Sequence, residues 1–431
     1  MPLIARLAHG RVHYAWLVAG LTFVTLLAAA GVRSTTGLLM VPLEQEFGWT
    51  RATISAANSI NLLLYGLIGP FAAAVIDRVG VRRTMACALS VVALGVVSTT
   101  VMTRSWHLML LWGVVVGCGT GMTAIVLGAI VANRWFASHR GLVVGALTAC
   151  TATGQLIFLR PLAGLVEGYG WRTAVIAAAG FVALVMPLVA WLIRDRPSDL
   201  GLLPYGASAP EPAPPRPGNP FVAPIEALWR GFQSRDFWLL FMSFFICGAS
   251  TNGLIGTHLI AACFDHGIPE VRAAGLLALM GVFDFIGTTV SGWLSDRWSN
   301  RWLLFWYYGL RGLSLIYLPY ALDISFLGLS LFAVFYGLDW IATVPPTVRL
   351  TANAFGKEQV GMMFGWIVAG HQVGAAFASL GAGVLRTELG SYLEAFVISG
   401  SLCAIAAVMS LYVGRRAPGK RRDLEAAPAT G

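Results

Sequence analysis

The sequence carries little charge for its length. Of its 431 residues only 11% are Asp, Glu, Lys or Arg, while 57% are hydrophobic. A soluble domain has roughly 25% charged residues, so this chain lacks the polar surface that would keep a fold of its size in water. A lipid bilayer provides the apolar surroundings that such a composition requires. The composition therefore excludes an ordinary soluble protein and indicates a membrane protein.

The sequence also lacks the motifs of metal sites and of catalysis. Its six cysteines form no C-x-x-C pair and all lie in apolar stretches, so we expect neither a structural disulfide nor a zinc site. No G-x-S-x-G, H-E-x-x-H or phosphate-binding P-loop occurs. We expect a protein that is not an enzyme, uses no cofactor and does not hydrolyse ATP. The net charge of +9 does not predict a nucleic-acid partner, because loops and the C-terminal tail hold most of the basic residues.

Long apolar stretches are the main feature that is present. A spanning helix needs about 20 consecutive apolar residues. Twelve stretches qualify, and they predict an all-α membrane protein of twelve transmembrane helices, at 14–43, 53–76, 82–102, 106–132, 140–165, 172–194, 237–262, 271–295, 302–321, 325–350, 359–385 and 392–413.

The distribution of Lys and Arg predicts the orientation. If the N-terminus is inside, 21 of these residues lie on the cytoplasmic side and five lie on the other side. Cytoplasmic loops are the basic ones in membrane proteins, so both termini are predicted to be cytoplasmic, in a bacterial inner membrane. Three arginines remain inside predicted spans: Arg33, Arg160 and Arg311.

One polar break divides the chain into two halves. The stretch 207–220 is rich in proline and cannot form a regular helix, and 225–235 is predicted to form a short amphipathic helix on the membrane surface. The expected organisation is an N-terminal six-helix half at 1–194, a cytoplasmic linker at 195–236, a C-terminal six-helix half at 237–413 and a tail at 414–431.

The two halves repeat one another. At an offset of 219 residues, Asp77 matches Asp296 and Arg78 matches Arg297. At an offset of 220, glycines of the fifth and eleventh stretches match, which predicts close backbone approach there: Gly141, Gly145 and Gly154 match Gly361, Gly365 and Gly374. Two parallel repeats of this kind are typical of transporters that rock two halves around a central site.

The loop after the second stretch resembles a family motif. It reads Asp77-Arg78-Val79-Gly80-Val81-Arg82-Arg83 and is similar to the D-R-x-G-R-R core of the major facilitator superfamily, with a weaker copy at 292–297. Val81 intrudes before the arginines, and Ala73 replaces the leading glycine of the motif. Together with the repeat, the resemblance covers the whole chain and implies the major facilitator fold.

A narrower resemblance points to carriers of monocarboxylates and of oxalate and formate. Phe47-Gly48-Trp49-Thr50-Arg51 resembles the F-G-W-S-R turn of that group, and Gly170-Trp171-Arg172 and 196–201 also recur there. Those carriers place an acid on the eighth helix, followed four residues later by an arginine. Asp284 matches the acid, but Thr288 occupies the arginine position. The resemblance therefore implies that a carboxylate-binding residue lies elsewhere, or that the substrate is not a simple monocarboxylate.

Ionisable residues in mid-span are costly and mark function. Asp284 is a candidate for proton coupling, or a structural partner that holds helices together. Arg311, at a similar depth, is either the partner of Asp284 or a fork for a substrate carboxylate. Asp339 is a second candidate for proton coupling.

The predicted substrate site draws on several helices. Arg33 and its repeat mate Asn252 lie on the first and seventh stretches, which line the central cavity in the superfamily. Arg33 could instead reach the outer interface. The other candidates for substrate contact are Arg160, Gln155, His371 and Tyr65, although spanning histidines and aromatics more often serve in packing. The predicted gating residues are Asp77, Arg78, Arg82, Arg83, Asp296 and Arg297, which are expected to pair across the closed cytoplasmic face or to act only in topology.

These observations predict a secondary transporter that works by alternating access. The leading expectation is proton-linked movement of a small organic anion, a carboxylate, because three arginines lie within the membrane. Its expected partners are that solute and membrane lipid, and the chain is expected to be a monomer. Two alternatives stay open: a carrier or exporter of a larger aromatic or amphipathic compound such as a vitamin or drug, and a membrane sensor of the same fold that transports nothing.

Overall fold

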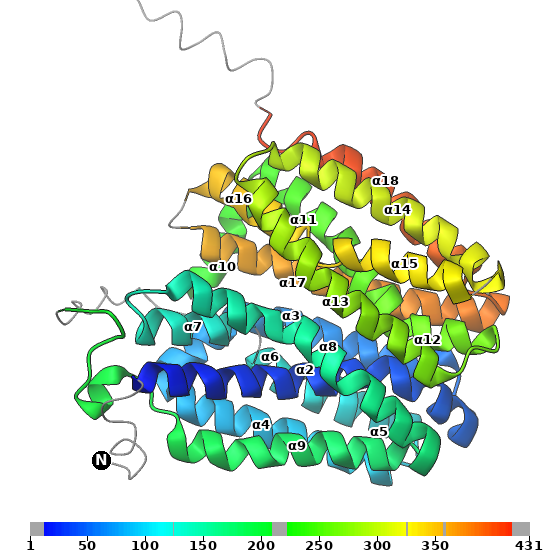
Figure 1. Ribbon diagram of the computed structural model, residues 1–431, viewed down its shortest axis with the longest axis horizontal. Helices are drawn as coiled ribbons and strands as arrows, with labels where there is room; N and C mark the ends of the chain where they lie inside the picture. The colour runs from blue at the N-terminus through cyan, green and yellow to red at the C-terminus, as the bar shows by residue number, and fades with distance from the viewer. Residues whose placement is uncertain (1–12, 124, 209–221, 325, 357–358, 416–431) are drawn as a thin grey trace, which may run out of the picture.

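The computed structural model describes residues 13–415, apart from 124, 209–221, 325 and 357–358. Its helices run roughly side by side in two bundles (Figure 1). The chain from blue to green forms one bundle, and the chain from green to red forms the other. Each of the twelve predicted spans coincides with one helical crossing in this part of the chain, so the predicted fold of two six-helix halves is confirmed.

The first half contains six crossings. They are α2 (Tyr14–Phe47), α3 (Arg51–Val79), α4 (Val81–Ser98, extended by η1 Thr99–Val101), a fourth made of α5 (Ser105–Leu108), η2 (Met109–Val116), α6 (Gly117–Met122) and α7 (Ile125–Trp135), then α8 (Arg140–Tyr169) and α9 (Trp171–Leu192). The sharp connections have a local cause. Gly48 ends α2 with a φ of 67°, a left-handed conformation that glycine adopts without strain, and the Thr50 side chain then caps α3 by accepting from Thr53 N.

The second half contains six more crossings. They are the continuous run of α11 (Arg235–Gly248), η4 (Ala249–Ile255) and α12 (Gly256–Asp265), then α13 (Glu270–Ser295), α14 (Asn300–Ile324), the broken pair α15 (Phe326–Asp339) and α16 (Val344–Phe355), α17 (Val360–Leu389) and α18 (Leu393–Ser410). Ten of the twelve crossings are long and apolar enough to span a membrane by themselves; the other two, α8 and α14, are 30 and 25 residues long.

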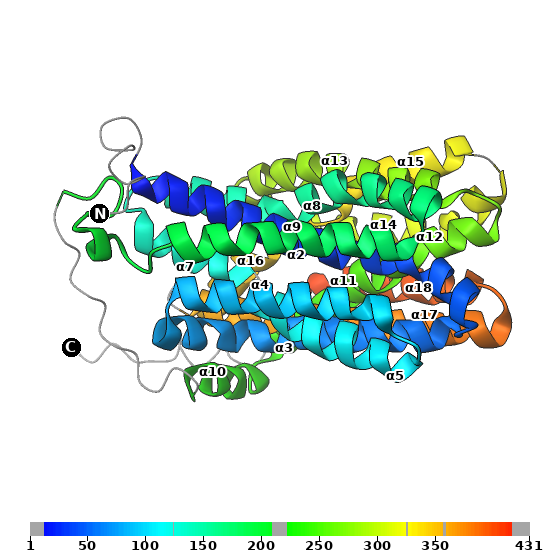
Figure 2. The same ribbon diagram turned by 90° about the horizontal axis from the view of Figure 1, so that it is seen from below.

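The described ends of the chain and the linker lie at the same end of the bundle. The Tyr14 hydroxyl donates to Leu192 O at 2.6 Å, so the start of α2 meets the end of α9. Gly414 N donates to Asp236 Oδ1 at 2.7 Å, so the end of α18 meets the start of α11. We call this the linker end, and the end that holds Gly48 and Asp265 the far end. Figure 2 shows both bundles running between them.

The linker contains a short 3-10 turn, η3 (Pro197–Leu200), and a helix, α10 (Val222–Phe232). The helix begins three residues earlier than predicted and ends three residues earlier. Its exposed apolar side chains are Val222, Ile225, Trp229 and Phe232, whose spacing places them along one face. Most of the proline-rich stretch 207–220 lies outside the described residues, and contact of α10 with a membrane surface stays a prediction.

Glycines let the two halves meet closely. A Cβ at Gly37 of α2 would lie 2.9 Å from Gly256 O of α12, a distance that real Cβ atoms essentially never show. Further along the interface, α3 packs against α17, where a Cβ at Gly383 would overlap the Ser55 side chain. Backbones in close contact give dense packing that lipid cannot replace.

The predicted glycine contacts of α8 and α17 hold at only some positions. A Cβ at Gly154 would lie 2.6 Å from Ala30 Cβ, and one at Gly374 would overlap Phe245 O. Gly145, Gly361 and Gly365 have nothing within 4 Å of such an atom. The repeat therefore identified the right helices, but only the deeper glycines serve close approach.

This difference gives a matched test on one helix. Gly374→Ala should lower the thermal unfolding temperature of the purified protein, because the added methyl overlaps backbone and overpacking costs about 1–3 kcal/mol. Gly365→Ala should leave stability unchanged or raise it slightly, because alanine favours a helix over glycine by about 1 kcal/mol. Equal unfolding temperatures for the two variants would contradict the packing described here.

Candidate functional site

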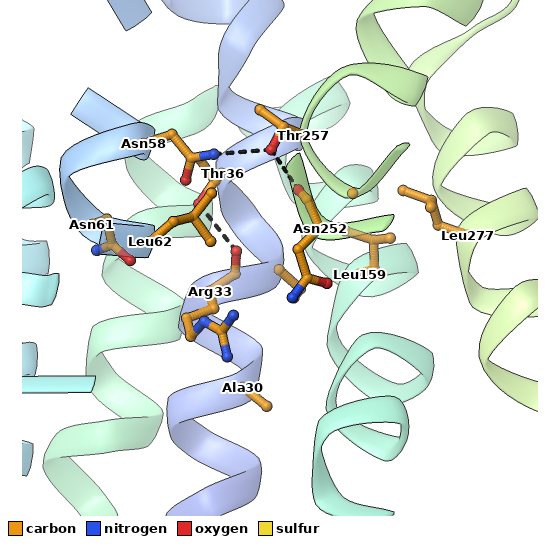
Figure 3. A pocket seen from close by; sticks show the side chains of 12 residues that line it. Ala30, Arg33, Thr36, Asn58, Asn61, Leu62, Leu159, Asn252, Thr257 and Leu277 are labelled. Atoms are coloured by element: carbon orange, nitrogen blue, oxygen red, sulfur yellow. Dashed lines mark hydrogen bonds between the residues drawn. The ribbon is translucent and has the colours of Figure 1, made fainter. Parts of the chain in front are cut away.

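A small polar cavity lies between the halves near the middle of the bundle (Figure 3). Its volume is about 50 Å³, and residues of α2, α3 and α8 face residues of η4, α12 and α13 across it. That volume suits a few water molecules, whereas pockets for drug-sized ligands measure roughly 300–1,000 Å³. The polar side chains in its wall are Arg33, Ser34, Thr36, Asn58, Asn61, Asn252 and Thr257. All of them except Arg33 are uncharged.

Arg33 is the cation of this cavity. Its guanidinium carbon lies 3.8 Å from the centre of the Tyr65 ring, a cation–π contact. Among the described residues, no carboxylate pairs with Arg33. A second, smaller cavity of about 20 Å³ continues past Arg33 and Tyr65 to Thr123. The structure thus brings together Arg33 and Tyr65, and it directs the arginine into the interior rather than to the outer interface.

Asn252 lies on the other side of the cavity, on a stretch of π-helix. Such stretches are rare and frequently occur at functional sites. The π-helical stretch is η4, and Thr257 Oγ1 of the adjoining α12 donates to Asn252 O at 2.9 Å. The predicted pair of Arg33 and Asn252 therefore does meet at one cavity.

Two asparagines of α3 complete the wall and were not predicted. Asn58 Nδ2 donates to Thr257 Oγ1 at 2.9 Å and to Ser379 Oγ at 3.0 Å, and Asn61 Nδ2 donates to Trp112 O at 2.7 Å. Their signal in the sequence was two amides three residues apart within an apolar stretch. Amides in a span are a weaker indication of function than charged residues, which are the costly ones in a membrane.

The mid-membrane charged residues Arg311, Asp339 and Asp284 of the second half lie in a separate cluster away from the cavity wall. Arg311 Nε donates to Asp339 Oδ2 at 2.7 Å, and its other nitrogens donate to Asp339 O, Trp340 O and Cys247 Sγ. Arg311 is only 1% exposed. Its donors are therefore engaged by protein, which corrects the prediction that Arg311 acts as a fork for a substrate carboxylate.

Asp284 does not pair with Arg311 either. Its Oδ1 accepts from Ile341 N at 2.9 Å and from Thr288 Oγ1 at 3.0 Å. The threonine at the position where related carriers have arginine thus donates to the acid one turn away. The prediction of an Asp284–Arg311 ion pair is wrong, because Asp339 occupies the guanidinium.

The cluster surrounds a break between α15 and α16. Residues 340–343 form a turn, and Pro345 and Pro346 lie in the first turn of α16, so carbonyls at the end of α15 and in the turn lack their usual helical donors. Arg311 serves the carbonyls of Asp339 and Trp340, and Ser291 Oγ donates to Ala342 O at 2.5 Å. Unsatisfied backbone groups are costly inside a membrane. Arg311 and Ser291 therefore have a structural role: they satisfy backbone carbonyls at the break.

Comparison with known proteins agrees with this architecture. The family model described as Major Facilitator Superfamily matches residues 21–348 and 273–430. The chain belongs to the Major Facilitator Superfamily. It is thus a multi-pass membrane protein of a transporter family and not an enzyme.

Relatives of this superfamily member match over nearly their whole length. An uncharacterized MFS-type transporter, YcxA of Bacillus subtilis (strain 168), is 26% identical over 414 residues, which cover 92% of this chain and 94% of that one. Monocarboxylate transporter 13 of Rattus norvegicus is 26% identical over 392 residues and covers 90% and 86%. A crystal structure of a bacterial homologue of the human lysosomal transporter Spinster, inward-facing and unoccupied, matches with a TM-score of 0.74 at 14% identity over 95% of this chain and all of that one.

The loop residues of the superfamily motif form ion pairs within each half. Asp77 pairs with Arg134 of α7, and Asp296 pairs with Arg349 of α16. The expected pairing of Asp77 across the two halves does not occur among the described residues. Arg82 N donates to Asp195 Oδ1 at 2.9 Å, and Arg297 lies over the Trp293 ring at 4.3 Å. Arg78 and Arg83 are exposed at the same linker end.

The remaining candidates lie outside the cavity wall. Arg160 is exposed on α8 beside Pro161, whereas its neighbour Leu159 lines the cavity. His371 packs against the Phe244 ring at 5.0 Å, with Nε2 at 3.5 Å from Thr251 Oγ1. The side chain of Gln155 is outside the described part of the structure. Neither Arg160 nor His371 joins Arg33 at the cavity.

The structural duty of Arg311 can be tested by stability. Arg311→Gln should leave Asp339 as a buried, unpaired charge, which costs about 3–5 kcal/mol, so the yield of folded protein and its unfolding temperature should fall. The double variant Arg311→Gln with Asp339→Asn should recover part of this loss, because no unpaired charge is left. A single variant as stable as the wild type would contradict the assignment.

Proposed function

We propose that this superfamily member moves a small organic anion, a carboxylate, across a bacterial inner membrane. The observation that carries the proposal is Arg33, a cation that faces a cavity between the halves and has no carboxylate partner among the described residues. A cation inside a membrane without a counter-ion is costly, and an anionic solute supplies one. The relatives named monocarboxylate transporters support the same solute class.

The cavity wall supports recognition of more than charge. A guanidinium can bind both oxygens of a carboxylate through parallel hydrogen bonds. The amides of Asn61 and Asn252, together with the hydroxyls of Ser34 and Thr36, offer uncharged donors and acceptors for the rest of the solute.

The proposal extends to proton coupling at Asp284. Asp284 is 3% exposed, and within the described part of the chain it accepts hydrogen bonds from two uncharged donors, Ile341 N and Thr288 Oγ1. Asp339, in contrast, is tied to Arg311. Asp284 can therefore exchange a proton without breaking an ion pair, which makes it the better coupling candidate of the two. It also lies on the same helix as Leu277 of the cavity wall, seven residues or roughly 10 Å along the axis.

The orientation is part of the proposal. The bias of Lys and Arg, 21 against five, favours a cytoplasmic linker end and an outward far end. In the structure, α10 and the loop ion pairs of Asp77 and Asp296 belong to the linker end, as this orientation requires.

Substitution of Arg33 tests the solute class. In proteoliposomes, Arg33→Gln should weaken uptake of pyruvate and benzoate about tenfold to a hundredfold at low concentration, because a charged hydrogen bond contributes about 1.5–3 kcal/mol. Arg33→Lys should retain more activity than Arg33→Gln. Arg160→Gln is the matched control, since it removes an arginine outside the cavity wall and should leave uptake unchanged.

The result that would contradict the proposal is equally specific. Wild-type protein that transports neither carboxylate, but exports an uncharged aromatic compound, would rule out the anion assignment. Counterflow that is absent for every solute would favour the sensor alternative.

The proton role of Asp284 has its own test. Asp284→Asn keeps an oxygen that accepts from Ile341 N, so the fold should survive. Uptake driven by a pH gradient should fall at least tenfold, whereas exchange of labelled for unlabelled solute should persist, because exchange can cycle with the site permanently neutral. Gradient-driven uptake that survives in Asp284→Asn would show that another residue carries the proton.

A further inference from the structure

The far end of the bundle is closed by a buried arginine. Arg51, at the start of α3, is 4% exposed and donates to both carboxylate oxygens of Asp265 on α12, at 2.6 and 2.7 Å. It also donates to Glu44 Oε2 at 2.9 Å and to the Tyr392 hydroxyl at 3.2 Å. Asp265 accepts in addition from Arg386 Nε at 2.8 Å. Arg51 and Glu44 belong to the first half, and the other three residues belong to the second, so these bonds join the two halves.

A chain of hydrogen bonds continues from this closure toward the centre. The Tyr392 hydroxyl is 3.0 Å from His258 Nδ1, and His258 Nε2 is 2.8 Å from Ser379 O. His258 and Ser379 are both fully buried. Ser379 Oγ in turn accepts from Asn58 Nδ2 at 3.0 Å. The chain therefore runs from Arg51, through three residues of the second half, to an asparagine of the cavity wall.

The path crosses between the halves twice. Arg51 and Asn58 both lie on α3, about two turns apart. The hydrogen bonds that connect them to this path, to Tyr392 and to Ser379, both cross the interface between the halves. Asn58 also holds Thr257, next to His258 on α12, at 2.9 Å. The ion pairs of the linker end described above lie within single halves. The far end is thus closed by contacts that must break if the halves separate there.

We propose that Asn58 is a positioning residue for alternating access: it anchors the inner end of a relay, through Ser379, His258 and Tyr392, that holds Arg51 on Asp265 and keeps the far end closed. This goes beyond the proposed solute, because the relay acts whatever the cavity carries. A solute whose polar atoms hydrogen-bond to the Asn58 amide in the cavity loosens the far end. A solute that does not disturb the Asn58–Ser379 bond keeps the far end closed.

Cys263 provides a built-in probe for this opening. It is 0% exposed on α12, two residues before Asp265. In intact cells, a membrane-impermeant maleimide should label Cys263 slowly in the wild type and about tenfold faster in Asn58→Ala. Tyr392→Phe should have a similar effect, because it removes the hydroxyl between Arg51 and His258 but keeps the ring. Loss of the label in Cys263→Ala variants identifies the labelled residue.

Two comparisons distinguish the relay from general loosening. Asn61→Ala is the matched control: Asn61 lines the same cavity but donates to Trp112 O within its own half, so the labelling rate should not change. The double variant Asn58→Ala with Tyr392→Phe interrupts the same relay at two points, so its labelling rate should be little higher than that of the faster single variant. Rates that multiply, or labelling that stays at the wild-type rate in both single variants, would overturn the proposal. Size-exclusion profiles confirm that each variant is folded, and carboxylate uptake by the wild type reports separately on the proposed function.

Discussion

The backbone between α15 and α16 has to satisfy its polar groups without water, and the buried charges of the second half are arranged around that need. A turn at 340–343 interrupts the tenth crossing, which leaves carbonyls at the end of α15 and in the turn without helical donors. Arg311 supplies donors to two of these carbonyls and is neutralised by Asp339 of the same crossing. At this break a cation supplies donors to the backbone, and an acid of the same crossing neutralises the cation.

This constraint separates the polar residues of the interior into two groups. Residues that complete the broken helix are buried, have protein partners and lie within one half. Residues of the cavity wall come from both halves and are mostly amides and hydroxyls, with Arg33 as the cation. The separation explains why mid-membrane charge alone is a poor guide to the solute site. Asp284 lies between the groups, since it accepts from Ile341 N at the break but forms no ion pair with any described residue.

The interface between the halves also contains two kinds of contact, close backbone packing and polar bonds. Glycines at Gly37 and Gly383 allow backbones to approach closely, which fixes how the halves fit. Polar contacts at the far end, centred on Arg51 and Asp265, add bonds that can break and reform. Packing thus shapes the closed state, and the hydrogen-bonded residues provide the part of it that a transport cycle can change.

Composition and pattern by themselves determined the architecture of this protein. Apolar stretches of sufficient length, the repeat at a nearly constant offset and the motif around Asp77 identified twelve crossings in two halves, because the bilayer imposes a length and a hydropathy that are visible in any sequence. The repeat also paired Arg33 with Asn252, and both line the cavity in the structure, since equivalent helices of two repeats face the same axis. Partner choice was decided only by the tertiary structure. Asp284, Asp339 and Arg311 lie on three helices at similar depth, and which acid meets the guanidinium depends on helix rotation and on the break at 340–343. The same holds for Asn58 and Arg51, whose partners in the other half lie some 200 to 340 residues away in the sequence. Whether a hydrogen bond forms depends on the positions of its two atoms to within a few tenths of an ångström. No sequence pattern specifies those positions before the helices are packed.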